Sequence, residues 1–255
     1  ILLVGVSIYI RMKMSESPMF TKLKAEGKTS ANPLKESFRR KANFKMVLLA
    51  LFGAVMGQGV IWYTGQFYAQ NFLETKCFID FEQSRTILLW GIAFATPFFI
   101  FWGWLSDKIG RKWIMMAGMA LAIFTYRPIF GTFLKDTTIN ETNIQAIGYL
   151  KEGPFDITKK EVLKNNDVVT THTSKKELNN HLKFTVVYTD TSFYLGTRPT
   201  VSSQPKLIDK KLPDSVYWKF IGLIFLLILY VTMVYGPIAA FLVEMFPTKI
   251  RYTSM

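Results

Sequence analysis

The chain has 255 residues, 50% of them hydrophobic, and yet it carries a net charge of +13 at pH 7. Such a chain must keep its apolar and basic residues apart, and here the apolar residues collect in runs long enough to cross a ~30 Å hydrocarbon layer as helices. Uncharged runs of this length argue against a soluble globular protein. Basic residues that flank these runs, instead of forming one face with interleaved aromatics, argue against a nucleic-acid partner.

Four apolar runs predict membrane-spanning helices, because a helix satisfies its backbone hydrogen bonds within one segment. We therefore predict an all-α membrane protein, with buried helices of a large soluble protein as the alternative. The spans are expected at 46–73, 87–105, 113–134 and 220–243. The predicted order is the end of a transmembrane helix at 1–10, a cytoplasmic loop at 11–45, three transmembrane helices with short loops at 46–134, an extracytoplasmic insertion at 135–217, and a transmembrane helix with a cytoplasmic end at 218–255.

The charged connections predict the direction of these helices. Basic residues far outnumber acidic ones between residues 11 and 45, whereas acidic residues prevail between 74 and 85. Because positively charged loops stay in the cytoplasm, residues 106–112 are expected inside and the insertion outside the cell (cytoplasmic or inner) membrane. The basic flanks would also contact anionic membrane lipid.

The polar insertion is much longer than an ordinary connection and predicts a small α+β module. Residues 161–165 and 174–183 favour helix, and residues 184–189 alternate like a strand. His172 and His181 have no third ligand at metal-site spacing, so we expect surface histidines and no metal. Cys77 is the lone cysteine, and we expect a small residue near the outer surface.

Polar and aromatic side chains form a stripe on the first full span. Polar groups in a spanning helix prefer a cavity to lipid, and amides with aromatic rings suit a small polar or zwitterionic metabolite. The alternative is that the glutamines bond neighbouring helices and the aromatics form an interface belt. With two tyrosines of the fourth span, the hypothetical substrate path comprises Gln58, Trp62, Tyr63, Gln66, Tyr230 and Tyr235.

Two charged motifs carry a family resemblance. The loop of Gly103, Asp107, Lys108, Gly110, Arg111 and Lys112 resembles the G-x-x-x-D-[RK]-x-G-R-[RK] loop of the major facilitator superfamily. Residues 244–251, which include Glu244 and Arg251, resemble its E-x-F-P-T-x-x-R segment. The stretches 57–68 and 235–242 are further similar to the metabolite:proton symporter family, whose members transport proline and betaine, α-ketoglutarate, citrate or shikimate.

This resemblance implies a fold and an activity. The chain would contain the end of helix six and helices seven to ten of a twelve-helix fold, as a carboxyl-half fragment whose amino-terminal half is missing. Helices seven and ten line the central path in that family. The implied activity is alternating-access transport of a small-molecule substrate, an organic acid or zwitterion, with a proton as coupling ion. Because Glu244 is the only acid near a span, we expect the proton-coupling acid in the other half.

The charged loop is expected to act as a conformational latch. Its carboxylate can meet a helix N-terminus, and Arg111 can pair bidentately with an acid such as Glu244. Breaking and remaking these contacts would bias one access state. The alternative is a topogenic loop, which would explain Lys108, Arg111 and Lys112 but not Asp107 or the glycines.

Catalytic motifs are absent from the sequence. It contains no P-loop, nucleophile elbow or metal-binding box, so we predict no enzyme, no catalytic residue, no metal and no cofactor. A sugar or drug carrier of the same superfamily is one alternative function. A membrane-anchored receptor that uses the 135–217 module is the alternative from another class.

Overall fold

The computed structural model describes residues 2–13, 25, 33–138, 157–162, 168–177, 183–192, 201–203 and 206–246. Within these residues, four helices are long and apolar enough to cross a membrane: Lys41–Thr75, Phe81–Ile109, Arg111–Thr137 and Asp214–Met245. Each contains one of the four predicted runs, so the prediction of four long apolar helices is confirmed. Together they indicate a multi-pass membrane protein.

The first of these helices changes its winding twice. It is built from α4 (Lys41–Leu49), α5 (Met56–Tyr63) and α6 (Ala69–Thr75), which are joined by two π-helical segments, η1 (Ala50–Val55) and η2 (Thr64–Tyr68). A π-helical turn contains more residues than an α-helical turn, so it shifts the side chains that follow it around the helix axis. The shorter helices α1 (Leu2–Lys13) and α3 (Pro33–Arg39) precede it.

The remaining helices begin and end at residues whose chemistry explains the boundary. The carboxylate of Asp80 accepts a hydrogen bond from the Gln83 N–H at 3.2 Å and caps α7 (Phe81–Ala95). Pro97, which has no N–H to donate, separates α7 from α8 (Phe98–Ile109). Helix α9 (Arg111–Thr137) follows Gly110, and the last helix is α11 (Asp214–Met245).

The chain forms two compact units, one of residues 1–57 with 237–255 and one of residues 58–236. The first contains α1, α3, α4, η1 and the last turns of α11. Its buried residues include Ala50, Ala54 and Phe246. The second contains most of the spanning helices and the whole insertion.

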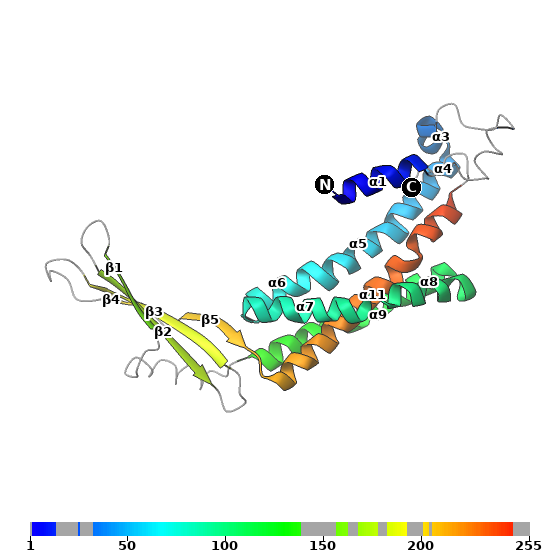
Figure 1. Cartoon of the computed structure of the whole chain (residues 1–255). Coiled ribbons are helices and arrows are strands. Elements are labelled where there is room, and N and C mark those ends of the chain that lie inside the picture. The colour runs from blue at the N-terminus through cyan, green and yellow to red at the C-terminus, as the bar shows by residue number, and fades with distance from the viewer. Residues whose placement is uncertain are drawn as a thin grey trace. The chain divides into compact units, whose positions relative to one another are not determined.

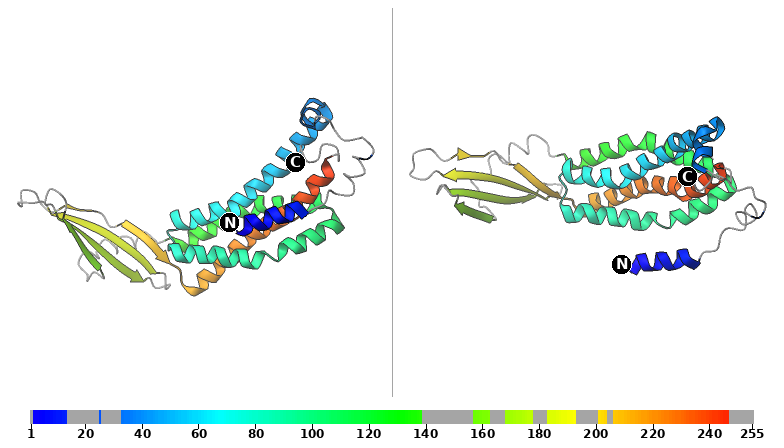
Figure 2. Two further views of the ribbon diagram at one scale, coloured as in Figure 1. Left: turned by 45° about the horizontal axis from the view of Figure 1, so that its top comes forward. Right: turned by 90° about the horizontal axis from the view of Figure 1, so that it is seen from above.

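In the second unit, α11 is the central helix. The other three spans each approach it at a glycine: Gly65 in η2, Gly91 in α7 and Gly118 in α9. A Cβ atom at any of these glycines would lie 2.6–2.9 Å from a side-chain carbon of α11, closer than non-bonded carbons approach. In its most apolar stretch, α11 is 61% buried, and no other span exceeds 28%. Figures 1 and 2 show α6, α7 and α9 side by side with α11.

The described part of the insertion is an antiparallel sheet (Figure 1). Its central strand β3 (Lys183–Ser192) pairs on one side with β2 (Val168–Glu177), which in turn pairs with β1 (Ile157–Val162). On its other side β3 pairs with β4 (Val201–Ser202) at one end and with β5 (Lys206–Lys211) at the other.

The sheet of the predicted α+β module is confirmed, with the predicted strand at 184–189 as part of β3. The predicted helices at 161–165 and 174–183 are wrong where the structure describes them, while residues 163–165 and 178–182 lie outside the described residues. Residues 161–162 belong to β1, residues 174–177 to β2 and residue 183 to β3. Lys and Glu favour helix only weakly, and cross-strand pairing, such as Lys175 opposite Thr185, outweighs that preference.

Four hydrogen bonds join the sheet to the ends of the helices. The Lys210 N–H donates to the Phe78 carbonyl at 2.6 Å, and the Asp80 N–H donates to the Lys210 carbonyl at 2.8 Å. The side-chain amide of Gln83 donates from Nε2 to the Leu212 carbonyl at 3.1 Å and accepts at Oε1 from the Leu212 N–H at 2.7 Å. These four bonds fix the end of β5 to the turn between α6 and α7.

The core of the second unit continues through this junction. Phe184 and Val186 of β3 belong to the same buried cluster as Phe220 and Ile224 of α11. Cys77 lies in this cluster with no exposed surface, and its expected position near the outer membrane surface stays a prediction. A thiol packs as a small hydrophobic group, which suits it to the space beneath the sheet.

Candidate functional site

The charged connection between α8 and α9 is shorter than predicted. The expected loop at 106–112 reduces to Gly110 alone, because Asp107 and Lys108 form the last turn of α8 while Arg111 and Lys112 begin α9. Gly110 has a φ of +107°, a conformation that other residues rarely adopt. One glycine therefore reverses the chain and keeps the charged residues on helix ends.

Asp107 and Arg111 form an ion pair across this reversal. The Arg111 Nη2 and Nε donate to the Asp107 Oδ1 at 2.9 and 3.3 Å. An acid at the end of α8 and a base at the start of α9 each oppose their helix dipole, and pairing offsets both costs. The Asp107 side chain is 63% exposed, against 22% for Arg111. The carboxylate therefore remains open to a second donor.

Lys108 is held on an aromatic ring. Its Nζ lies 4.0 Å from the centroid of the Trp104 ring, within the range of a cation–π interaction. Lys108 is also placed favourably at the carboxyl end of α8, where a positive charge complements the helix dipole. Asp107 stabilises the reversal at Gly110 through its pair with Arg111, whereas both interactions of Lys108 lie within α8.

The backbones of α8 and α11 approach closely at Gly236. A Cβ there would lie 3.3 Å from the Phe99 carbonyl oxygen and 3.6 Å from the Gly103 nitrogen, whereas a Cβ on Gly103 itself would meet no atom within 4 Å among the described residues. The backbone of α11 therefore packs directly on α8. Glu244 is exposed near the end of α11, and its pairing with Arg111 stays a prediction. Arg251 lies outside the described residues.

The predicted substrate-path residues on the first span lie around the second π-helical segment. Gln58 and Gln66 are half-buried, while Trp62 and Tyr63 are exposed. Both rings pack on Phe67, with centroids 5.2 and 5.6 Å away. π-Helical turns occur frequently at functional sites. Gln66 lies inside η2, next to the glycine that contacts α11, which keeps a path role for it open as a prediction.

The two tyrosines predicted on the fourth span face different neighbours. Tyr230 is buried and packs against Tyr126 of α9 at a centroid distance of 6.3 Å, whereas the exposed Tyr235 packs against Phe99 of α8 at 6.5 Å. The Tyr126 hydroxyl donates to the Ile61 carbonyl at 3.5 Å. Tyr126 therefore links three spans, a role that its position in an apolar run does not reveal.

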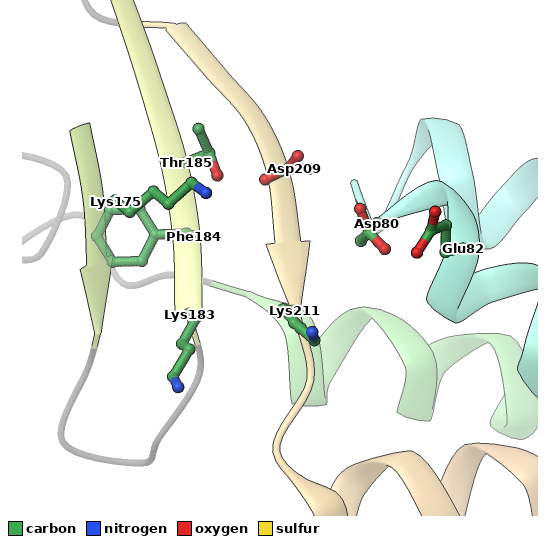
Figure 3. Close-up of a pocket in the computed structure, with 8 residues that line it drawn as sticks. All are labelled: Asp80, Glu82, Lys175, Lys183, Phe184, Thr185, Asp209 and Lys211. Carbon is green, nitrogen blue, oxygen red and sulfur yellow. The ribbon is translucent and has the colours of Figure 1, made fainter. Parts of the chain in front are cut away.

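A charged cleft opens where the sheet meets the helices. Its volume is about 480 Å³, and Figure 3 shows its walls. Asp80 lies just before α7 and Glu82 lies in its first turn, and both face strands that carry lysines. The cleft is lined by Asp80, Glu82, Lys175, Lys183, Phe184, Thr185, Asp209 and Lys211. No sequence motif reveals this site, because its residues are scattered over the loop, three strands and a helix start.

Beneath the cleft, a buried lysine joins the sheet to α9. The Lys210 Nζ donates to the Thr137 carbonyl at the end of α9. Burial lowers the pKa of Lys210, and the nearby Cys77 opposes this shift. Burial likewise raises the pKa of Cys77, against the effects of its hydrogen bond with Thr137 and the charge of Lys210. An ion pair between Lys219 and Asp136, at 2.7 Å, links the end of α9 to α11.

The described histidine belongs to the sheet. The His172 Nε2 lies 3.1 Å from the Asp190 carboxylate on the neighbouring strand, and its side chain is only 14% exposed, so the expectation of a surface histidine is wrong. His181 lies outside the described residues. Within the described part of the chain, no group of three or more potential metal ligands occurs.

Comparisons with known proteins gave no match: no family model, no curated protein and no solved structure matches the chain.

Proposed function

We propose that the chain is part of a secondary active transporter that moves a small metabolite by alternating access. Its charged α8–α9 connection would lie at the inner side of the membrane. The substrate would be an organic acid or a zwitterion such as proline or betaine, and a proton would be the coupling ion. In this proposal the four spans correspond to helices seven to ten of a major facilitator fold, and an amino-terminal half completes the path.

The ion pair of Asp107 with Arg111 is the observation that carries this proposal. A helix pair that only anchors a protein needs positive charge at its cytoplasmic end, but it has no need of an acid paired beside a glycine reversal. Because the Asp107 carboxylate is still exposed, it can exchange its arginine for another donor when neighbouring helices move. The aromatic and amide groups beside η2 support a polar substrate.

Uptake by cells that express the full reading frame of this chain tests the proposal. Labelled proline, betaine, α-ketoglutarate, citrate and shikimate would be offered with and without a protonophore. Proton symport predicts accumulation of at least one compound and its loss when the proton gradient collapses. Uptake of none of them, with counterflow of a labelled sugar or drug, would favour the alternative carrier.

Asp107→Asn separates a latch from a topogenic loop. The variant keeps every positive charge, so the amount of protein in the membrane should not change, while uptake should slow about tenfold, the effect of ~1.4 kcal/mol on one access state. Glu161→Gln, which neutralises an exposed acid of β1 outside this loop, serves as the control. If Asp107→Asn transports at the normal rate, the latch is wrong.

Replacing residues 139–205 with a short Gly–Ser linker tests the receptor alternative. This change retains the end of β5 and its hydrogen bonds to the helices. A transporter whose path lies among the spans keeps its uptake, whereas a receptor that acts through the sheet loses its ligand response.

A further inference from the structure

The cleft at the sheet–helix junction carries equal numbers of opposite charges. Three carboxylates and three ammonium groups line it, so its net charge is zero although the chain as a whole is strongly basic. A volume of about 480 Å³ falls within the usual range for small-molecule sites, roughly 300–1,000 Å³. Size alone therefore allows a metabolite, and the charges decide which kind.

The sheet register arranges the charges of one wall. Lys175 lies opposite Thr185, which lies opposite Asp209, so these three residues form one row across β2, β3 and β5. Lys183 lies opposite Lys211 in the next row of the same face, because residues two apart on a strand share a face. The register thus sets two lysines beside each other at one end of this face, next to the junction.

The opposite wall is acidic. Asp80 and Glu82 face the strands from the start of α7 (Figure 3). Asp80 is held in place because its carboxylate caps α7 and its backbone is bonded to Lys210. The positions of the two walls are therefore determined by the same bonds that join the sheet to the helices.

We propose that this cleft binds a small zwitterion of the amino-acid type, with its carboxylate toward Lys183 and Lys211 and its ammonium group toward Asp80 and Glu82. A ligand with one charge would satisfy one wall and meet like charges at the other. A zwitterion forms charge-assisted hydrogen bonds at both walls. This proposal concerns binding alone and holds whether or not the helices transport the ligand.

Calorimetric titration of the purified full chain in detergent tests the proposal. The zwitterionic probes are L-proline and 6-aminohexanoate, which differ in charge separation. Each is compared with an anionic analogue, N-acetylproline or 6-acetamidohexanoate, and with a cationic one, prolinamide or 6-aminohexanamide. We expect at least one zwitterion to bind, and both of its single-charge analogues to bind about tenfold more weakly or worse, as the loss of a charge-assisted bond predicts.

Two neutralising variants locate the binding. Glu82→Gln and Lys211→Gln lie on opposite walls, and each should weaken the zwitterion about tenfold. Their matched controls are Glu161→Gln and Lys160→Gln on β1, exposed positions of the same sheet that do not line the cleft. Unchanged thermal unfolding shows that a variant is folded, and with two variants one folding failure leaves the other informative.

Three results would overturn the proposal: neither zwitterion binds, a single-charge analogue binds as tightly as its parent, or the controls weaken binding as much as the cleft variants. Binding with no uptake in cells would leave this site in place and remove the transporter. Uptake with no binding at the cleft would keep the transporter and remove this site.

Discussion

At the scale of single residues, Lys210 matters more than its position in a polar strand suggests. Its backbone extends the sheet onto residues 78–80, and its side chain reaches the end of α9. A buried ammonium group is costly unless it is hydrogen-bonded, and the Thr137 carbonyl supplies that bond. The lone thiol of Cys77 is fully buried in the core at this junction, and so reports whether the sheet stays in place.

We predict that Lys210→Ala raises the rate at which a maleimide labels Cys77 in the folded protein by about tenfold or more. The reason is that losing a buried hydrogen bond to a charged donor costs roughly 1.5–3 kcal/mol, which increases local opening of the junction. Mass spectrometry would follow the labelling. Lys211→Ala, at the exposed neighbouring lysine, is the control, and equal rates in the two variants would contradict the role given to Lys210.

At the scale of secondary-structure elements, the glycines of three spans explain why α11 is central. Each removes a side chain at the point of contact, so the helix backbones approach closely and gain packing that lipid does not supply. The contact at Gly91 is the tightest of those with α11, because a Cβ there would lie 2.6 Å from Ile224 Cγ2 and 3.3 Å from the Phe225 nitrogen. A side chain can move aside, but the backbone nitrogen cannot do so without shifting α11.

Gly91→Ala should therefore lower the free energy of unfolding by about 1–3 kcal/mol, the usual cost of overpacking a tight contact. Gly222→Ala is the matched control on α11, since a Cβ there meets nothing within 4 Å among the described residues. Alanine is the better helix former, so the control should be as stable as the parent or slightly more stable. Thermal unfolding in detergent measures both, and a Gly91→Ala protein as stable as Gly222→Ala would refute the tight contact.

At the scale of the whole molecule, much of the apolar surface remains uncovered. Few residues in the apolar stretches of the first three spans are buried, and large side chains such as Ile100, Ile123 and Phe124 are exposed. Water cannot solvate so much apolar surface without a large free-energy cost, so these faces require lipid or further helices. The polar sheet lies at the opposite end of α9 from the charged reversal at Gly110, which places the two on opposite membrane surfaces once α9 spans the bilayer.

Cysteine labelling tests the direction of this arrangement. In a Cys77→Ser background, a membrane-impermeant maleimide should label Lys160→Cys in the sheet of intact cells. It should label Lys108→Cys, at the end of α8, only after the membrane is made permeable. The expectation follows from the basic residues beside the reversal, which favour the cytoplasm. Labelling of Lys108→Cys alone in intact cells would invert the proposed topology.

The sequence by itself determined the number of long apolar helices and their approximate limits, because run length and the need to satisfy backbone hydrogen bonds are local properties. It also located the reversal at Gly110, where only a glycine adopts the required φ easily. Tertiary structure decided which face of each helix packs on α11, that Lys175 and Glu177 lie in a strand, and that the charges at 80–82 line the same cleft as those at 209–211. These outcomes depend on contacts between residues far apart in the chain, where cross-strand pairing and shared burial outweigh local preference.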